Sequence, residues 1–362
     1  MKILILLTIV ISLIYIVKIH LQDSHNIVFK YYKCNKYKNT KVLEEVFDQN
    51  RIVRSYNIND WDIYLPCGYN SIESQLKNIK VDNINQKIFG ISGCDTIVSK
   101  NKLWSIIENM YSRTNALKLM PESFLYSNSM DLLLFKHQYT KNTNYLIKKN
   151  LQRKKGIIIS NNYNEIIDLK NNGFKVIQKY IENLYLIKER KVNLRMYLLI
   201  VCNNYNISFY LHNKGKCIYT NKNFKTNSLD PEIHLTSLNI SEDIYKDRPQ
   251  TLEDLKCYLG HYLYNKLITN INKNIILVIK ACKSHLCNLE SIKKITSFQL
   301  FGLDYMFTNE MYPYLLEMNK GPSMGSINDI DYKVKTNIMT DVFKIIEVVK
   351  NENNEFIKLS ID

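Results

Sequence analysis

The order of apolar and polar residues divides the chain into an apolar start, a polar stretch and a long mixed region. Residues 3–17 are apolar apart from Thr8 and Ser12, and residues 22–45 are polar and rich in lysine. From Trp61 onward, apolar residues recur at the periods of strands and helices, with no internal repeat. The pattern therefore predicts a globular region that is preceded by an apolar segment and a polar linker.

Within the globular region, the periods predict mixed strand and helix up to about residue 120, then mainly strands, then helices around a hairpin. Strands are expected at 145–149, 156–160, 174–181, 193–202 and 207–211. Helices are expected at 102–111, 252–268, 275–286 and 333–349. A hairpin of strands 301–307 and 312–319 fits a four-residue loop at 308–311. This mixture predicts an α/β (α+β) fold.

The apolar start predicts a membrane anchor over residues 1–22. Its fifteen apolar residues are fewer than the roughly 20 that span hydrocarbon, but Lys2 and Lys18 can snorkel and Ile19 and Leu21 extend it. No small-residue cleavage site lies nearby, and the lysines downstream favour a cytoplasmic location for the rest of the chain. We expect a single-pass membrane protein with a cytoplasmic catalytic portion. A buried N-terminal helix of the domain is the alternative.

Composition and net charge limit the class of protein and the kind of partner that are possible. The 362 residues are 46% hydrophobic, enough to bury a sizeable core and unlike a disordered chain. A net charge of +15 suggests an acidic partner, although the excess of Ile, Asn, Lys and Tyr is also what AT-rich coding would give. Nucleic acid is not expected as a partner, because no cluster combines basic and aromatic residues.

The cysteines are scattered singly along the chain. All eight are therefore expected to be reduced, buried thiols and not a disulfide framework. The segment from Cys282 through His285 to Cys287 resembles part of a zinc site, but it lacks a fourth ligand at a usual spacing and lies in a helical apolar pattern. Core packing is the better interpretation.

The expected hairpin carries the first candidate chemistry. Asp304 lies on its first strand, and Glu317 and Asn319 lie two residues apart on one face of the second. Paired strands bring such side chains together. Two carboxylates and an amide oxygen form a hard ligand set of the kind that suits Mg²⁺ beside phosphate oxygens. The hairpin therefore predicts a magnesium site.

A basic turn upstream predicts a phosphate site. Lys148 lies on one expected strand, and the turn Gln152–Gly156, which includes Lys154 and Lys155, leads into the next. This layout suits holding polyphosphate beneath a loop. The order along the chain is then a lysine strand, a basic loop, a strand ending near 181, the strand of Arg195 and the acidic hairpin.

Two longer segments resemble a known family. The string "SFQLFGLDYMF…YPYLLEMNKGPSM" resembles the F-E-L-x-G-x-D…P-x-L-L-E-x-N-x-x-P-S signature of the tubulin–tyrosine ligase family, which includes tubulin glutamylases and glycylases. The string "VIQKYIENLYLI…RKVNLRMYLLI" is similar to the family's Q-K-Y-I…G-R-K-F-D-x-R-x-Y segment. "MPESF", "HLTS" and "DYKVK" are weaker echoes in the expected order. The resemblance covers residues 61–349.

The resemblance implies an ATP-grasp fold with an N-terminal mixed lobe, and ATP and Mg²⁺ as cofactors. The expected parts are an anchor at 1–22, a polar linker at 23–45, an N-terminal lobe at 46–120, a central ATP-grasp subdomain at 121–181, a C-terminal ATP-grasp subdomain with the Mg²⁺ site at 182–350 and a tail at 351–362. The implied reaction is ATP-dependent ligation of glutamate, tyrosine or glycine to a carboxylate of an acidic, tubulin-like protein tail through an acyl phosphate.

The resemblance also assigns roles residue by residue. Asp304, Glu317 and Asn319 are matched to Mg²⁺ and the ATP phosphates, and Arg195 to the γ-phosphate or an acyl phosphate as the catalytic residue. The residues matched to nucleotide contacts are Lys100, Lys148, Lys154, Lys155, Gly156, Gln178, Lys179, Ile181, Lys191 and Asn193. Of these, Gln178, Lys179 and Ile181 fall on the adenine-binding hinge, the last two through backbone groups.

Four positions depart from the family pattern. Asn193 replaces an aspartate, Gln299 replaces a glutamate and Ser237 replaces an asparagine. Ile218 stands where the family has an arginine that helps with ATP or with the carboxylate of the donor. Lys216 or Lys222 could substitute for that arginine.

Three alternatives remain open from the sequence. A membrane-tethered pseudoenzyme that binds ATP without ligation is favoured by Ile218 and opposed by the complete metal triad. A nucleic-acid-binding protein is suggested only by the net charge. A different ATP-grasp ligase, acting on a small peptide or metabolite, is the alternative within the enzyme class.

Overall fold

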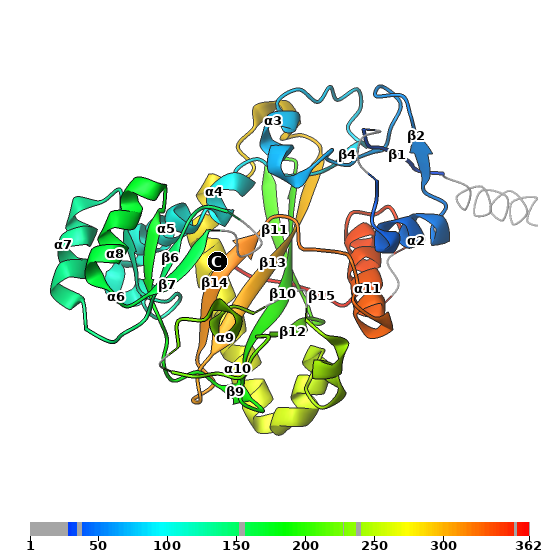
Figure 1. Cartoon of the computed structure of the whole chain (residues 1–362). Coiled ribbons are helices and arrows are strands. Elements are labelled where there is room, and N and C mark those ends of the chain that lie inside the picture. The colour runs from blue at the N-terminus through cyan, green and yellow to red at the C-terminus, as the bar shows by residue number, and fades with distance from the viewer. Residues whose placement is uncertain are drawn as a thin grey trace, which may run out of the picture.

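The computed structural model describes residues 28–34, 38–151, 156–226, 228–236, 240–350 and 353–361. It contains a large mixed sheet at the centre and a four-stranded sheet at one side, with helices packed against both (Figure 1). The mixed α/β class predicted from the sequence is confirmed. The large sheet has the order β15-β11-β10-β13-β4-β3-β1-β2, with β12 and β9 paired to β10 and β14 paired to β13. The small sheet has the order β5-β8-β6-β7.

The strands are mostly short, and β10 and β13 are the longest. Their bounds are β1 Lys30–Tyr32, β2 Val53–Ser55, β3 Ile63–Tyr64, β4 Lys87–Phe89, β5 Ser123–Leu125, β6 Tyr145–Lys148, β7 Ile157–Ser160, β8 Val176–Lys179, β9 Leu186–Ile187, β10 Arg190–Asn203, β11 Asn206–His212, β12 Lys216–Tyr219, β13 Thr296–Phe307, β14 Pro313–Asn319 and β15 Phe356–Lys358.

The helices range from a single turn to the long α10. Their bounds are α2 Lys41–Gln49, α3 Ile72–Leu76, α4 Cys94–Val98, α5 Lys100–Tyr111, α6 Arg113–Ala116, α7 Ser129–Gln138, α8 Tyr163–Asp168, α9 Pro231–His234, α10 Leu252–Cys282 and α11 Asp329–Ile345. Short 3-10 turns lie at Tyr69–Ser71, Leu169–Asn172, Glu242–Lys246, Lys283–His285 and Glu290–Ile292.

The long strands β10 and β13 are buried on both faces, because apolar side chains alternate toward two separate cores. Leu194, Leu198 and Ile200 pack in a core with α5 and α10, whereas Tyr197 and Leu199 pack with α2 and α11 on the other face. Strands buried on both sides read as nearly continuous apolar runs. Arg195 and Asp304 interrupt these runs, and a buried charge in a strand core requires a partner.

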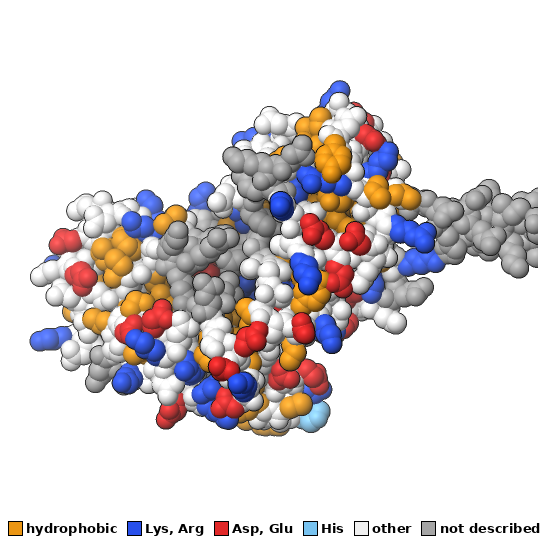
Figure 2. Space-filling model, turned by 45° about the vertical axis from the view of Figure 1, so that its right-hand side comes forward, with side chains coloured by type: hydrophobic (Ala, Val, Ile, Leu, Met, Phe, Trp, Pro, Cys, Tyr) orange, Lys and Arg blue, Asp and Glu red, His pale blue; other side chains and the backbone are white. Residues whose placement is uncertain are grey.

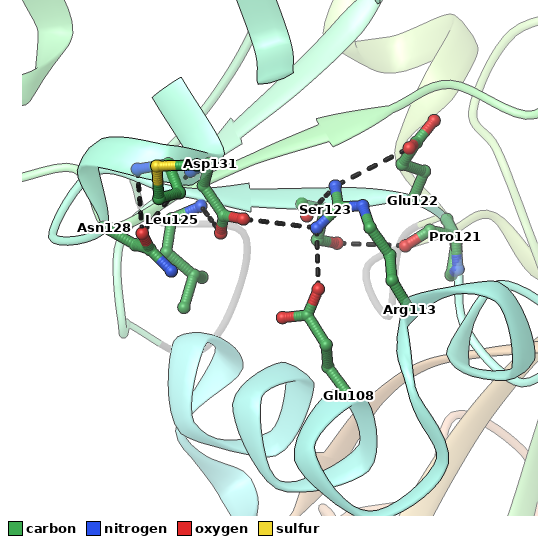
Figure 3. A network of polar contacts seen from close by, with 9 residues as sticks. Glu108, Arg113, Pro121, Glu122, Ser123, Leu125, Asn128 and Asp131 are labelled. Atoms are coloured by element: carbon green, nitrogen blue, oxygen red, sulfur yellow. Dashed lines mark hydrogen bonds and ion pairs between the residues drawn. The ribbon is translucent and has the colours of Figure 1, made fainter. Parts of the chain in front are cut away.

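Arg113 of α6 joins α5 and α7 to β5 of the small sheet. As Figure 3 shows, its guanidinium points into a group of acidic side chains, with Nη1 2.7 Å from Glu108 and 3.2 Å from Asp131, while Nη2 donates to the Ser123 carbonyl at 3.0 Å. Asp131 in turn accepts from the backbone N–H of Leu125 at 2.8 Å. The position of β5 is therefore fixed by side chains from α5, α6 and α7.

Several sequence-based element boundaries need correction. The described part of the expected linker 23–45 contains β1 and the start of α2, where Tyr31 and Val42 are buried, so it belongs to the fold. The two helices expected at 252–268 and 275–286 fall mostly within α10, which continues through 269–274 and is instead interrupted at Gly260 (φ 76°, ψ 162°), where two helical segments meet. The predicted hairpin is confirmed as β13 and β14.

The expectation of eight reduced, buried thiols is wrong for five of them, because four are paired as disulfides and Cys257 is exposed. The structure joins Cys34 to Cys67 and Cys202 to Cys287 as disulfides, with Cα–Cα distances of 5.5 and 6.1 Å. Folding brings these pairs together from positions far apart in the sequence, which spacing alone does not reveal. Because Cys287 is paired with Cys202, it is not available to a zinc site, in agreement with the core-packing interpretation of that segment.

The membrane prediction also needs correction. Within the described ranges, no helix combines the length and apolarity needed to cross a bilayer. This finding contradicts two predictions, the location as a single-pass membrane protein and the membrane as a partner. Residues 1–22, on which those predictions depended, lie outside the described residues.

The surface does not gather the net charge into one patch on the face that Figure 2 draws. Lys and Arg side chains alternate there with Asp and Glu side chains over the described residues. Exposed lysines also pair with aspartates among the described residues, as Lys222 does with Asp230 and Lys188 with Asp247.

Candidate functional site

Four neighbouring strands bring charged residues onto one face of the large sheet. Strand register sets Lys216 of β12 opposite Arg195 of β10, Arg195 opposite Asp304 of β13, and Asp304 opposite Glu317 of β14. Cross-strand partners share a face of the sheet. The result is a row in which cations and carboxylates meet across the strands.

The three residues predicted to hold magnesium lie together in this row. Asn319 Nδ2 lies 3.3 Å from a carboxylate oxygen of Asp304 and 3.2 Å from one of Glu317. Asn319 stands opposite Gly302, near Asp304 and Glu317 in the hairpin register. Two carboxylates and one amide within reach of each other fit a hard cation such as Mg²⁺. Their role as metal ligands stays a prediction.

Arg195 pairs with Asp304 through both ends of its guanidinium. Nε lies 2.5 Å from Asp304 Oδ1, and Nη2 lies 3.0 Å from Oδ2. Burial lowers the pKa of Arg195, but the charge and hydrogen bonds of Asp304 outweigh burial, so this pKa is raised and the side chain stays charged. Gly302 allows the approach, because a Cβ there would lie 2.9 Å from Arg195 Cδ.

Lys100 and Lys148 reach the acidic hairpin from outside the large sheet. Lys100, at the start of α5, places Nζ 3.2 Å from Glu317 Oε2. Lys148 of β6 is buried and donates to Gln178 Oε1 at 2.6 Å, and Gln178 Nε2 donates to Ser123 Oγ at 3.0 Å. Burial lowers the pKa of Lys148 to about 8, with Glu317 opposing the shift.

Lys191 and Asn193 continue the same face of β10 toward the small sheet. Lys191 Nζ donates to the carbonyl of His234 at 2.9 Å and lies 5.2 Å from the centre of the Tyr180 ring. Burial, followed by the charge of Lys148, lowers its pKa to about 7. Asn193 Nδ2 donates to Thr236 Oγ1 at 3.1 Å, whereas its buried Oδ1 has no hydrogen-bond partner among the described residues.

Comparison with known proteins decides the family. The model of the tubulin-tyrosine ligase family matches residues 77–355, which is most of the chain. The chain belongs to the tubulin-tyrosine ligase family. The resemblance inferred from the hairpin and hinge strings is thereby confirmed.

Individual members of the tubulin-tyrosine ligase family match only in part. A "Probable tubulin polyglutamylase TTLL9" of Rattus norvegicus is 27% identical over 184 residues, 48% of this chain and 38% of the relative. A "Probable alpha-tubulin polyglutamylase Ttll1" of Tetrahymena thermophila is 25% identical over 256 residues, 64% of this chain and 60% of the relative. A "Tubulin glycylase 3A" of Drosophila melanogaster is 24% identical over 210 residues, 54% of this chain and 21% of the relative. The matched part of the chain thus spans less than two thirds of these relatives.

The other residues that the family resemblance matched to nucleotide contacts lie around the small sheet. Lys179 is exposed at the end of β8 and its backbone N–H donates to the Glu122 carbonyl at 2.8 Å. Ile181 packs with Tyr180 in the small core between the two sheets. Gly156, at φ 75°, accepts from the backbone N–H of Lys149 and closes the turn into β7. Lys154 and Lys155 lie outside the described residues.

Sequence reasoning did not assign a second charged group beside Arg195. Asp331 and Lys335, one turn apart on α11, are buried with Lys216 of β12. The spacing of Asp331 and Lys335 in "DYKVK" is that of a helical ion pair, which was the available signal. Lys216 was considered only as a substitute for the arginine missing at Ile218. Their meeting depends on β12 pairing with β10, which no local pattern predicts.

Proposed function

We propose that the chain is an ATP- and Mg²⁺-dependent ligase that joins glutamate, tyrosine or glycine through an amide bond to a carboxylate of an acidic, tubulin-like protein tail. Membership of the tubulin-tyrosine ligase family and the names of the relatives, which describe tubulin polyglutamylases and a tubulin glycylase, support this proposal. The observation that carries it is the meeting of the acidic hairpin with the half-buried Lys100 and the buried Lys148. Lys100 lies 3.2 Å from Glu317, and the charge of Glu317 also acts on Lys148.

Each part of the site has a role in this proposal. Asp304, Glu317 and Asn319 would hold Mg²⁺, which when bound supplies positive charge against the phosphate oxygens. Lys148 and Lys191 bind phosphate groups, because neither has a carboxylate as its hydrogen-bond partner within the described chain. The unpartnered Oδ1 of Asn193 accepts a hydrogen bond from a ribose hydroxyl.

The proposed reaction has two steps that balance. An oxygen of the acceptor carboxylate attacks the γ-phosphorus, the bond to the β-phosphate oxygen breaks, and ADP leaves with the electron pair. The amine nitrogen of the donor then attacks the acyl carbon, the carbon–oxygen bond to phosphate breaks, and the nitrogen loses a proton. Both steps build negative charge on oxygen, which Arg195 and the lysines stabilise. Arg195 gives up part of its pairing with Asp304 to contact the acyl phosphate.

Ligation itself is the test of this function. The full chain is incubated with Mg-ATP, tubulin and each isotopically labelled amino acid in turn, and tubulin peptides are examined by mass spectrometry. We expect one of glutamate, tyrosine or glycine to be incorporated, and incorporation to stop when EDTA removes Mg²⁺. Nucleotide binding without ATP turnover or incorporation of any amino acid would instead indicate a pseudoenzyme.

The acceptor is tested by its charge. A glutamate-rich tail peptide and a neutral peptide with one acceptor carboxylate are compared at low and at moderate salt. Exposed charges are screened beyond roughly 8–10 Å near physiological ionic strength, so we expect the acidic peptide to react faster and to lose this advantage as salt is added. Equal rates, unaffected by salt, would point to a small peptide or metabolite as the acceptor.

A further inference from the structure

The end of β14, where the proposed metal ligands lie, is joined to two helices by two ion pairs of opposite direction. Lys100, at the start of α5, pairs with Glu317 at 3.2 Å. Asp95, in the first turn of α4, pairs with Lys320, which follows Asn319 directly in the sequence. The helix supplies the cation in the first pair and the anion in the second. The two helices thus contact the residues that flank Asn319.

The carboxylate of Asp95 is presented by a helix that is itself held in place. The backbone N–H of Asp95 donates to Glu73 Oε1 of α3 at 2.7 Å. Gly93, which precedes α4 at φ 85°, lies so close to the turn after α10 that a Cβ would be 1.9 Å from the carbonyl oxygen of His285. Contacts with α3 and with this turn therefore fix the position from which Asp95 reaches Lys320.

The main chain of Lys320 is held as well as its side chain. Gln299 of β13 is fully buried, and its Nε2 donates to the carbonyl oxygen of Lys320. A carbonyl oxygen only accepts hydrogen bonds, so an ionised carboxylate at position 299 could not make this contact. Gln299 is one of the four departures from the family pattern, which has a glutamate there. The amide thus makes a bond that the family residue, when ionised, cannot make.

We propose that Asp95, Lys320 and Gln299 are positioning residues for the Mg²⁺ site, an inference that rests on the proposed function. Gln299 fixes the carbonyl group of Lys320 and Asp95 fixes its ammonium group, so the backbone directly after Asn319 is held from two sides. The amide of Asn319 is thereby kept beside the two carboxylates of the hairpin. Gln299 is then a residue that this site needs, and not the loss of an acid.

A simpler role for Asp95 would be to neutralise a buried lysine. Lys320 is 5% exposed, and a buried cation without a partner is costly. The side chain of Asp95 is 45% exposed, and ion pairs in contact with water contribute little to stability. Neutralisation alone would therefore affect the melting temperature without changing how the chain responds to Mg²⁺, which separates the two roles by experiment.

ATP affinity with and without Mg²⁺ tests the positioning role apart from ligation. ATP is titrated into the full chain by calorimetry, once with Mg²⁺ and once with EDTA, and the Kd in EDTA divided by the Kd in Mg²⁺ gives the gain due to the metal. In Asp95→Asn and in Lys320→Met we expect this gain to fall by roughly tenfold, within the range of couplings inside one polar network. A lower melting temperature with an unchanged gain would overturn the inference.

The double variant of Asp95→Asn with Lys320→Met shows whether the two residues act as one pair. We expect it to lose no more of the gain than either single variant, because the first substitution already breaks the pair. Independent losses that multiply to roughly a hundredfold would overturn the pairing. Lys344→Met is the matched control, because Lys344 pairs with Asp341 at 2.8 Å within α11. If Lys320→Met does not fold, Asp95→Asn decides alone.

Gln299→Glu restores the residue of the family pattern and gives the sharpest contrast. If glutamate were the better residue in this chain, the variant would gain Mg²⁺-dependent affinity for ATP. We expect a loss at least as large as in Asp95→Asn, because an ionised carboxylate would be buried facing the carbonyl oxygen of Lys320. Gln299→Met removes the same donor without adding charge, and an unchanged gain in that variant would overturn the role of Gln299.

Failure of the ligase proposal gives a different result from failure of this inference. A wild-type chain that binds ATP more tightly with Mg²⁺ but ligates no amino acid would discard the ligase, and loss of that gain in Asp95→Asn would keep the positioning residues. A chain that ligates while Asp95→Asn keeps the full gain would keep the ligase and discard the positioning residues. A wild-type ATP affinity that does not depend on Mg²⁺ would overturn the inference.

Discussion

Two sets of buried cations next to one face of the large sheet differ in the groups that neutralise them. Lys148 and Lys191, toward the small sheet, donate to a side-chain amide oxygen and a backbone carbonyl. Arg195, Lys216 and Lys335, away from it, each pair with a carboxylate. The first set has no carboxylate that neutralises it, so an incoming polyanion, such as the proposed ATP, would favour the protonated form of both lysines. The second set is already paired with carboxylates, so its charge is largely compensated within the fold.

Glu317 lies between the two sets, and its loss should give the largest effect. Glu317→Gln keeps the shape but removes one carboxylate from the proposed Mg²⁺ ligands and from the partner of Lys100. We expect the Mg²⁺-dependent ligation rate to fall on the order of a hundredfold or more. Glu310→Gln, at the exposed end of the same hairpin, is the control. Near-normal turnover of Glu317→Gln would rule out the metal assignment.

The lowered pKa of Lys191 predicts opposite pH dependences for two quantities: the free energy of unfolding rises with pH, and the affinity for ATP falls. Its pKa in the fold is about 7, below the ordinary 10.5, so above pH 7 the unfolded chain holds the proton more tightly. The contribution of Lys191 to the free energy of unfolding therefore rises with pH between about 7 and 10. ATP favours the charged lysine, so its affinity should fall roughly tenfold from pH 7 to 8.5 as a proton must be taken up.

Calorimetry and unfolding measurements check both directions. Proton uptake on ATP binding is obtained from titrations in buffers of different ionisation enthalpy, with wild type and Lys191→Met. The variant should show less uptake and a flatter stability curve between pH 7 and 10. Identical uptake in both proteins would mean that Lys191 does not meet the phosphates.

Gly302 allows a test of the pairing between Arg195 and Asp304, with a smaller expected effect. In Gly302→Ala the new Cβ would lie 2.9 Å from Arg195 Cδ and 3.1 Å from Pro322 Cβ, so Arg195 must shift from Asp304. We expect kcat to fall by about tenfold or less, with the KM for ATP little changed, because misplacement of a group that stabilises the transition state acts on the rate. Gly325→Ala, where the nearest atom is 3.8 Å away, is the control. An unchanged kcat would show that Arg195 tolerates the shift.

The smallest effect is expected at Asn193. Asn193→Ala removes the unpartnered Oδ1 and should weaken ATP binding by about fivefold, the value of one neutral hydrogen bond. The variant should also lose discrimination between ATP and one of its 2′- or 3′-deoxy analogues. If the wild-type chain binds ATP and both deoxy analogues alike, Asn193 does not contact the ribose.

What the sequence could predict depended on how close the residues lie along the chain. Asp304, Glu317 and Asn319 belong to one hairpin, so strand period and a short loop suffice to bring them together. The ion pair of Lys216 with Asp331 joins residues more than a hundred positions apart. Its formation depends on where α11 packs on the sheet, which periodicity does not specify.

Other features that were not predicted from the sequence also depend on contacts between distant parts of the chain. Apolar spacing predicted helical segments on both sides of residues 269–274 but not that one helix, α10, continues between them. The stretch 23–45 looked like a linker because its lysines are numerous, yet Tyr31 and Val42 bury enough surface to fix β1 and α2. The Cys202–Cys287 pairing likewise results from tertiary folding.

Oxygen-isotope transfer tests the central claim most directly. An acceptor peptide with ¹⁸O in its carboxylates is ligated by the full chain with Mg-ATP and the active amino acid, and the released phosphate is analysed by mass spectrometry. Because the proposed acyl phosphate breaks at the bond between carbon and oxygen, one carboxylate oxygen leaves with phosphate for each amide formed. The account predicts one ¹⁸O in phosphate per amide from a fully labelled carboxylate. Amide formation with unlabelled phosphate would contradict it.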